Sequence, residues 1–217
     1  MQNFQSPLEA FLYWESKSPN RIFLKQPVYG KPYSLTYAEA GMEAKKIAAQ
    51  LKSYQLAEQS HIAILSKNCV HWLLADLAIM MAGHVSIPIY PTLAEEAIQQ
   101  ILEHSDSKVI IIGKLDNYPF QKSDIKNIHE ICVELYGNTN GDSWEHIVKS
   151  MQPLKSISLP KANQLHTIIY TSGTTGTPKG VMHTVGNFMS SANIMKETMN
   201  LAPGSRFFSY LPLAHVA

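Results

Sequence analysis

The sequence predicts an α/β fold in which flanking helices cover a mostly parallel sheet. Short β-prone runs alternate with helical patterns between residues 61 and 112, and this alternation is typical of β-α-β units. The run at 108–112 is apolar at nearly every position, as expected for a strand with both faces covered. Hydrophobic residues form 45% of the 217-residue chain, which is enough to build the core of such a domain.

The N-terminal segment is expected to form a helix, a hairpin and a second helix. Residues 8–14 are amphipathic, and a Pro- and Gly-rich turn at 27–32 separates two β-prone runs, which is the pattern of a hairpin. Thr36 and Glu39 then have the spacing of a capping box. Apolar residues at helical intervals follow as far as Leu51.

The next segment supplies the predicted β-α-β units. Asn68 is the expected N-cap of the first helix, which Gly83 ends. Thr92 and Glu95 have the spacing of a second capping box and predict the start of the next helix. The expected strands are 61–65, 85–89 and 108–112.

The C-terminal half continues with less regular spacing. Asp142 or Ser143 is expected to cap a short helix, and Phe188 and Met195 mark the apolar face of a longer one. The other expected segments are a loop at 113–124, strands at 128–135 and 206–210, and a connector at 153–162. Because a chain that ends on a strand leaves a sheet edge or apolar face uncovered, we expect it to self-associate.

Charge and cysteine content exclude several functional classes. Eighteen basic and seventeen acidic side chains nearly balance, so no basic field for nucleic acid is expected. Cys69 and Cys132 lie far apart and resemble no disulfide framework, which favours a reducing, cytoplasmic setting. Cys69 and His71 lack a partner pair at zinc spacing, so no metal site is expected.

No secretory signal or membrane span is predicted. The N-terminal residues lack a basic segment followed by an apolar one. The most apolar stretch, 70–90, is interrupted by polar residues and a proline, so a buried helix and strand explain it better than a transmembrane segment. Peripheral membrane contact and the oligomeric state stay open.

The stretch 170–180 carries the strongest chemical signal. Its glycines let backbone N–H groups approach a ligand, its hydroxyls add donors, and Lys179 adds a positive charge. The spacing is not that of a Walker A motif, and a β-prone run follows Gly180 where that motif needs a helix. We therefore predict a loop between two strands that forms an anion-binding nest. Composition alone is equally compatible with a polar surface hairpin.

Three stretches of the chain resemble those of a known family. Residues 171–179 resemble, position for position, the phosphate-loop signature of the adenylate-forming superfamily, which includes acyl-CoA synthetases, peptide-synthetase adenylation domains and luciferases. Residues 88–92 and the following helix and strand resemble its N-terminal subdomain. Residues 209–217 resemble the next family motif, in the form most typical of long-chain acyl-CoA synthetases. The resemblance extends from about Phe23 to the last residue.

The resemblance implies a ligase that works in two steps. A carboxylate attacks the α-phosphate of ATP to form an acyl-adenylate and pyrophosphate, and coenzyme A then takes the acyl group, with Mg²⁺ bridging phosphate oxygens. His215 is implied to line the junction of the acyl pocket and the α-phosphate; without the motif it would be a packed histidine at a strand end. The implied phosphate contacts are Thr171, Ser172, Gly173, Thr174, Thr175, Gly176 and Lys179.

The chain also departs from the family pattern. Val185 stands where many members have a histidine, and we expect it to pack the exit of the loop. The family's adenine, ribose and Mg²⁺ contacts and its C-terminal domain with the catalytic lysine have no counterpart. Residues 1–217 are therefore expected to be the truncated N-terminal portion of an AMP-binding domain, inactive alone. The alternatives are an enzyme that adenylates an aryl or amino acid, and a non-catalytic nucleotide-binding module.

Overall fold

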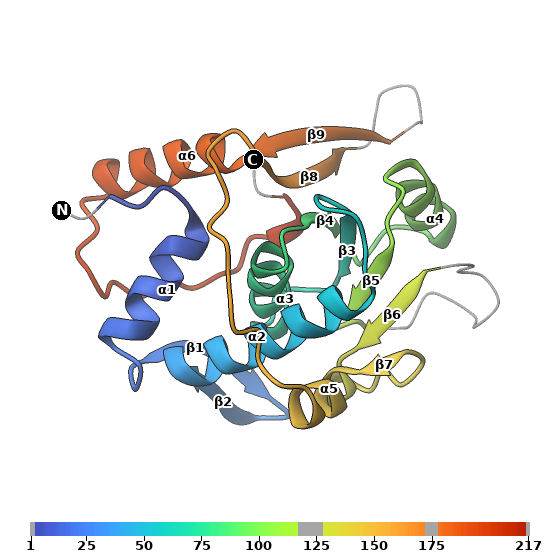
Figure 1. Ribbon diagram of the computed structural model, residues 1–217, viewed down its shortest axis with the longest axis horizontal. Helices are drawn as coiled ribbons and strands as arrows, with labels where there is room; N and C mark the ends of the chain where they lie inside the picture. Colours follow the sequence, from blue (N-terminus) through green and yellow to red (C-terminus); the bar gives the residue numbers. More distant parts are fainter. Residues whose placement is uncertain (1–2, 117–127, 172–177, 216–217) are drawn as a thin grey trace.

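A seven-stranded sheet forms the middle of the molecule in the computed structural model, which describes residues 3–116, 128–171 and 178–215. Its strands are β3 (His61–Leu65), β4 (Val85–Ile89), β5 (Val109–Ile112), β6 (His129–Cys132), β7 (Asp142–Ser143), β8 (Leu165–Thr171) and β9 (Lys179–Thr184). Their spatial order is β7-β6-β5-β3-β4-β8-β9, and each pair is parallel except β8 with β9. The predicted α/β class with a mostly parallel sheet is confirmed (Figure 1).

Two crossover helices lie on opposite faces of this sheet. Helix α3 (Val70–Met81) joins β3 to its neighbour β4, and α4 (Glu95–His104) leads from β4 back across β3 to β5. Because β-α-β crossovers are right-handed, this reversal of direction moves the second helix to the other face. Figure 1 shows α3 on one side of the strands and α4 on the other.

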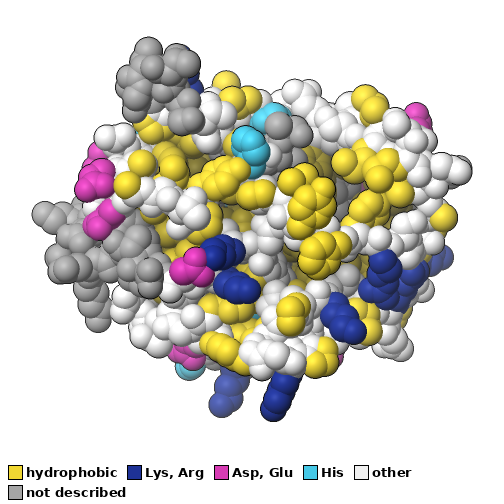
Figure 2. Space-filling model, turned by 180° about the vertical axis from the view of Figure 1, so that it is seen from behind, with side chains coloured by type: hydrophobic (Ala, Val, Ile, Leu, Met, Phe, Trp, Pro, Cys, Tyr) yellow, Lys and Arg dark blue, Asp and Glu magenta, His cyan; other side chains and the backbone are white. Residues whose placement is uncertain are grey.

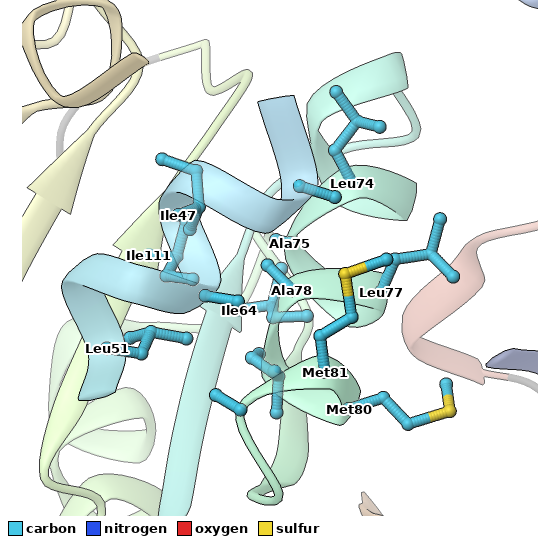
Figure 3. Close-up of a cluster of buried hydrophobic side chains, with 14 of the residues drawn as sticks. Ile47, Leu51, Ile64, Leu74, Ala75, Leu77, Ala78, Met80, Met81 and Ile111 are labelled. Atoms are coloured by element: carbon cyan, nitrogen blue, oxygen red, sulfur yellow. The ribbon is translucent and has the colours of Figure 1, made fainter. Parts of the chain in front are cut away.

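The larger core lies between the sheet and two long helices. Ile64 of β3 and Ile111 of β5 point toward α3 and α2 (Tyr37–Ser53), as the close-up in Figure 3 shows. The side chains that meet there include Ile47, Leu51, Leu74, Ala75 and Ala78, all with no exposed surface. Burial of this many apolar side chains is the main source of stability for the sheet.

The opposite face of the sheet has its own core. Ala63 and Leu65 of β3 point there with Ile110 and Ile112 of β5, and α4 covers them with Ile98, Ile101 and Leu102. Alternate residues of β3 thus enter different cores, and residues 62–65 are all buried. Coverage on both faces explains why the predicted strands read as continuous apolar runs.

The smaller elements mostly follow the predicted order. The N-terminal helix, the hairpin, the short helix capped by Ser143 and the helix after the loop are confirmed. The strand predicted at 128–135 is shorter, and part of the predicted 113–124 loop lies outside the described residues. These elements are α1 (Pro7–Lys17), β1 (Ile22–Val28), β2 (Lys31–Thr36), η1 (Glu134–Tyr136), α5 (Trp144–Ser150), α6 (Val185–Thr198) and η2 (Leu213–His215).

Only the first of the two predicted capping boxes forms. The Thr36 Oγ1 accepts a hydrogen bond from the Glu39 N–H at 3.2 Å, and the Glu39 carboxylate accepts one from the Thr36 N–H at 2.8 Å. At the second site the prediction is wrong, because the N-cap of α4 is Ala94, which has no capping side chain. The residues after β4 form a turn closed by the Leu93 N–H to the Tyr90 carbonyl, so Thr92 lies before the helix begins.

The strand predicted at 206–210 is wrong. These residues have no regular secondary structure, and they pair with no strand of the described chain. Phe207 and Phe208 are 62% and 86% exposed, so these β-prone side chains are not packed into a sheet. Met195 and Met199 of the α6 region are also exposed, and Figure 2 shows hydrophobic side chains gathered over the middle of the rear face.

No helix in the described ranges is both long and apolar enough to cross a bilayer. Cys69 and Cys132 are buried free thiols.

The two capping-box sequences allow a matched test. Thr36→Ala should lower the free energy of unfolding by about 1 kcal/mol, because it removes a formed cap. Thr92→Ala should change it by less than about 0.5 kcal/mol, because an exposed side chain outside a helix contributes little. Urea denaturation of both variants measures the difference. An equal loss for Thr92→Ala would mean that α4 is capped by this threonine after all.

His84 should make the fold sensitive to acid. Both ring nitrogens are buried without a hydrogen-bond partner in the described chain, and burial, followed by the charge of Lys52, lowers the pKa of His84 to about 4. Between pH 6.5 and 4 the unfolded chain therefore binds a proton that the folded chain does not, so stability falls as the pH falls.

His84→Leu should remove up to about 3 kcal/mol of this pH-dependent loss. Denaturation curves at pH 7, 5.5 and 4 measure it. Burial also lowers the pKa of His71 to about 4, so part of the slope should persist. An identical slope in wild type and variant would contradict the assignment to His84.

Candidate nucleotide site at the carboxyl edge of the sheet

The predicted loop lies between two antiparallel strands. Thr171 and Lys179 are paired at its base in the β8–β9 ladder, and the Thr171 Oγ1 lies 3.5 Å from the Lys179 carbonyl oxygen. Both residues are exposed. The two strands that flank the predicted loop are therefore confirmed. The other predicted phosphate contacts, Ser172, Gly173, Thr174, Thr175 and Gly176, lie outside the described residues.

A buried polar contact attaches this hairpin to the parallel sheet. Thr167 of β8 is the residue paired with Ser86 of β4, and its Oγ1 donates to the Ser86 carbonyl at 3.0 Å. Both residues are buried. Because a buried hydroxyl without a partner is costly, this bond favours one register of β8 against β4.

Gly180 has a packing role in the hairpin. A Cβ at this position would lie 2.8 Å from Ile168 Cγ2 and 3.3 Å from Tyr170 Cζ across the ladder. The first of these separations is shorter than any ordinary carbon–carbon contact. The absence of a side chain at 180 therefore lets the side chains of β8 lie against the neighbouring strand.

Tyr170 has a partner that the sequence did not reveal. Its hydroxyl lies 2.7 Å from Nδ1 of His104 at the end of α4, and the two rings meet edge to face. Burial raises the pKa of the Tyr170 hydroxyl. His104 thus links α4 to the residue just before Thr171. Its position at a helix end, with no accompanying motif, offered no signal for this contact.

His215 lies at the end of β4. Its ring contacts the Tyr90 ring at a centroid separation of 5.6 Å and an interplanar angle of 62°. Tyr90 directly follows Ile89, the last residue of β4. Ala214 is 2% exposed, whereas His215 itself is exposed. The neighbouring alanine therefore anchors this segment while the imidazole faces outward.

Register places the two predicted parts of the site at the same edge. Ser86 pairs with Thr167, and Tyr90 and Thr171 each lie four residues further along these parallel strands. Equal offsets along parallel neighbours correspond in position. The base of the loop and the Tyr90–His215 pair therefore belong to the carboxyl edge of the sheet, where ligands bind in open α/β folds.

Asn68 also lies at this edge, but in a different role from the predicted one. The N-cap of α3 is Cys69, which makes no side-chain capping bond. The Asn68 carboxamide bonds instead to residues 209–213, far along the chain.

Val185 packs as expected where many adenylate-forming enzymes have a histidine. It is fully buried at the first position of α6. Its N–H bonds to the Gln164 carbonyl just before β8, which joins the exit of the hairpin to its entrance. Thr184 caps the helix, with its side chain accepting from the Asn187 N–H at 3.2 Å.

Comparison with protein families agrees with this arrangement. The model of the family described as AMP-binding enzyme matches residues 11–217. The chain belongs to the AMP-binding enzyme family. The rat long-chain-fatty-acid–CoA ligase ACSBG2 (Rattus norvegicus) is 33% identical over 85% of the chain, and the peroxisomal long chain acyl-CoA synthetase 7 of Arabidopsis thaliana is 30% identical over 99%.

Solved structures share the fold. The AMP complex of O-succinylbenzoate coenzyme A synthetase from Bacillus subtilis has a TM-score of 0.77 and 24% identity, covering 99% of this chain and 50% of its own. The fatty acyl-adenylate ligase from L. pneumophila has a TM-score of 0.68 and 21% identity, covering 92% and 34%. The chain spans 30% and 32% of the rat and Arabidopsis relatives, about a third of their length.

The packing role of Gly180 predicts a measurable cost. Gly180→Ala should lower the free energy of unfolding by about 1–3 kcal/mol, because the new methyl group overlaps Ile168 in the hairpin. Val181→Ala, in the same strand at a 45% exposed position, should cost less than about 0.5 kcal/mol. Chemical denaturation compares them. A Gly180→Ala variant as stable as wild type would rule out the steric explanation for this glycine.

Proposed function

We propose that the protein to which this chain belongs is an ATP-dependent fatty-acid–CoA ligase. A carboxylate oxygen attacks the α-phosphorus of ATP, the bond to pyrophosphate breaks, and an acyl-adenylate forms. The sulfur of coenzyme A then attacks the acyl carbonyl carbon and AMP leaves. Family membership and the names of the rat and Arabidopsis relatives support this proposal. The observation that carries it is the convergence of the Thr171–Lys179 hairpin and the Tyr90–His215 pair at one sheet edge.

The hairpin is the proposed grip on the leaving pyrophosphate. Thr171 and Lys179 stand exposed and paired at the base of the loop, and no described carboxylate forms an ion pair with the Lys179 ammonium group. The ammonium group is therefore available to an anion as far as the described residues show, while the Thr171 hydroxyl lies 3.5 Å from the Lys179 carbonyl oxygen. A hydroxyl donor and a cation fixed on two paired strands suit the charge that develops on a phosphate leaving group. Ser172, Gly173, Thr174, Thr175 and Gly176 are proposed to complete the grip.

His215 is proposed to line the part of the site that binds the acyl substrate. Its imidazole is exposed and held against Tyr90, next to the strand that carries Thr171. An acyl group bound there would lie between the histidine and the α-phosphate, so positioning of the carboxylate is its proposed contribution.

We propose no residue of this chain as a ligand of Mg²⁺ or of coenzyme A. The described chain holds no group of three or more metal-ligating side chains that could bind Mg²⁺. The solved complex of the Bacillus subtilis synthetase with ATP and magnesium ion supports the use of both by this fold family. Coenzyme A as the acceptor is proposed from the names of the ligase relatives.

Residues 1–217 are proposed to form the N-terminal portion of the adenylation domain. Coverage of about a third of the ligase relatives supports this. On this view the isolated residues bind nucleotide weakly and do not complete the reaction. Buried free thiols at Cys69 and Cys132 support a reducing, cytoplasmic setting. Activation of an aryl carboxylate, as in the name of the Bacillus subtilis neighbour, is the alternative substrate class.

The proposal is tested by carboxylate-dependent exchange of pyrophosphate into ATP, in the natural-length gene product. Long-chain fatty acids should support exchange better than aryl or amino acids. Lys179→Ala should lower kcat/KM for ATP by about 100-fold, because it removes the positive charge that stabilises the leaving pyrophosphate. Lys161→Ala removes the same charge at an exposed position before β8 and should change the rate less than about twofold. Lack of exchange with every carboxylate would refute the ligase assignment.

A further inference from the structure

One carboxamide at the end of β3 holds the segment that precedes His215. The Asn68 Nδ2 donates to the Leu211 carbonyl at 2.7 Å, and to the Ser209 Oγ and carbonyl at 3.0 and 3.2 Å. The Asn68 Oδ1 accepts from the Leu213 N–H at 2.9 Å. Both ends of a single side chain are thus used by residues more than 140 positions away. A local helix-capping role does not explain these contacts.

Asn68 stands on a firmly held base. Two residues before it, the Ser66 Oγ accepts from the Lys114 N–H at 2.9 Å and so ties the end of β3 to the end of β5. Two residues after it, the Val70 N–H donates to the Gln26 Oε1 at 2.8 Å. Cys69 between them is buried. The carboxamide is therefore presented by two core strands and the start of α3.

Ala214 is buried and Leu213 packs against the larger core, but the part of the segment before them lacks such anchors. Residues 205–210 form no regular secondary structure, and Phe207, Phe208, Tyr210 and Leu211 are exposed. A short 3₁₀ turn follows, in which the His215 N–H donates to the Pro212 carbonyl at 3.0 Å. Since Leu213 is the first residue of that turn, its bond to Asn68 sets where the turn begins and where its last residue, His215, stands.

We infer that Asn68 is a positioning residue for His215, and through it for the carboxylate that the proposed ligase activates. The inference rests on the proposed function for its catalytic consequence, but its structural part stands on the four hydrogen bonds alone. Asn68 links the end of β3 to the Tyr90–His215 pair at the end of β4. The residues that follow β3 and the turn that ends at His215 are thereby held in one relative arrangement.

Carboxamide chemistry makes the inference specific. An amide offers two donors and an acceptor on one planar group. Aspartate keeps the shape and the acceptor for the Leu213 N–H, but it loses both donors and brings a negative charge to the carbonyls of Ser209 and Leu211. Asn68→Asp should therefore release the segment at almost constant volume. Asn163→Asp makes the same chemical change at an exposed asparagine that has no hydrogen bond from its side chain in the described chain, and serves as the control.

The first experiment measures position directly in the 217-residue chain. In wild type the His215 ring lies edge-on to Tyr90, so the Tyr90 ring current should displace its imidazole proton resonances. In Asn68→Asp they should move toward free-histidine values, and the Leu213 amide should exchange with solvent about tenfold faster or more. Asn68→Ser, which keeps a small polar side chain, is the second variant if the aspartate prevents folding. Unchanged His215 resonances and unchanged exchange at Leu213 would overturn the inference.

The second experiment is a double-mutant cycle on pyrophosphate exchange by the natural-length protein. Asn68→Asp should lower kcat about tenfold with KM for ATP within about twofold, because the acyl side is disturbed and the phosphate grip is not. In a His215→Ala background the same change should cost less than about twofold, because its target is gone. Equal losses in both backgrounds would show a general structural effect and refute the positioning role.

The two experiments fail separately. If the natural-length protein shows no pyrophosphate exchange with any carboxylate, the proposed function is refuted. The His215 resonances and the amide hydrogen exchange of Leu213 still decide whether Asn68 positions His215. If exchange is active and the double-mutant cycle is additive, the ligase assignment stands and Asn68 loses its role.

Discussion

The parallel pairing of β3 with β4 on one side and β5 on the other is the constraint on which the rest of the structure depends. Residues 62–65 are buried from both faces, by α2 and α3 on one side and α4 on the other. Such a strand leaves no room for polar loops along its length, because buried backbone groups need partners. Everything that can meet a ligand is therefore confined to the ends of the strands, and parallel strands have all their carboxyl ends at one edge.

Side-chain hydrogen bonds place the hairpin and the segment before His215 beside the parallel sheet. The buried Thr167–Ser86 contact fixes where the hairpin stands beside β4, and the Asn68 carboxamide holds a segment that has no secondary structure of its own. The Thr167–Ser86 bond is buried, where the low dielectric makes a hydrogen bond stronger than on an open surface. The Asn68 bonds act together on one segment. They can hold an irregular segment in place without a continuous ladder, which suits residues that must present side chains outward.

Local sequence patterns predicted the elements well and their ends less well. Thr36 and Thr92 begin identical capping-box spacings, yet only Thr36 caps a helix, since a turn after β4 uses the residues around Thr92. The run at 206–210 has the composition of a strand but no neighbour to pair with among the described residues. A capping box needs only four consecutive residues, whereas the choice between turn, strand and helix start also depends on what lies beside them in space.

The sequence by itself determined the parallel sheet, the strand–loop–strand setting of residues 170–180 and the family resemblance, because apolar periodicity and an ordered motif are local properties that the chain carries in any conformation. Only the tertiary structure decided that Asn68 serves residues 209–213, that His104 meets Tyr170, and that Tyr90 supports His215. These contacts join residues 66 to 145 positions apart through single side chains. A single hydrogen bond leaves no periodic trace in sequence, so its partner is known only once the strands bring both groups to the same edge.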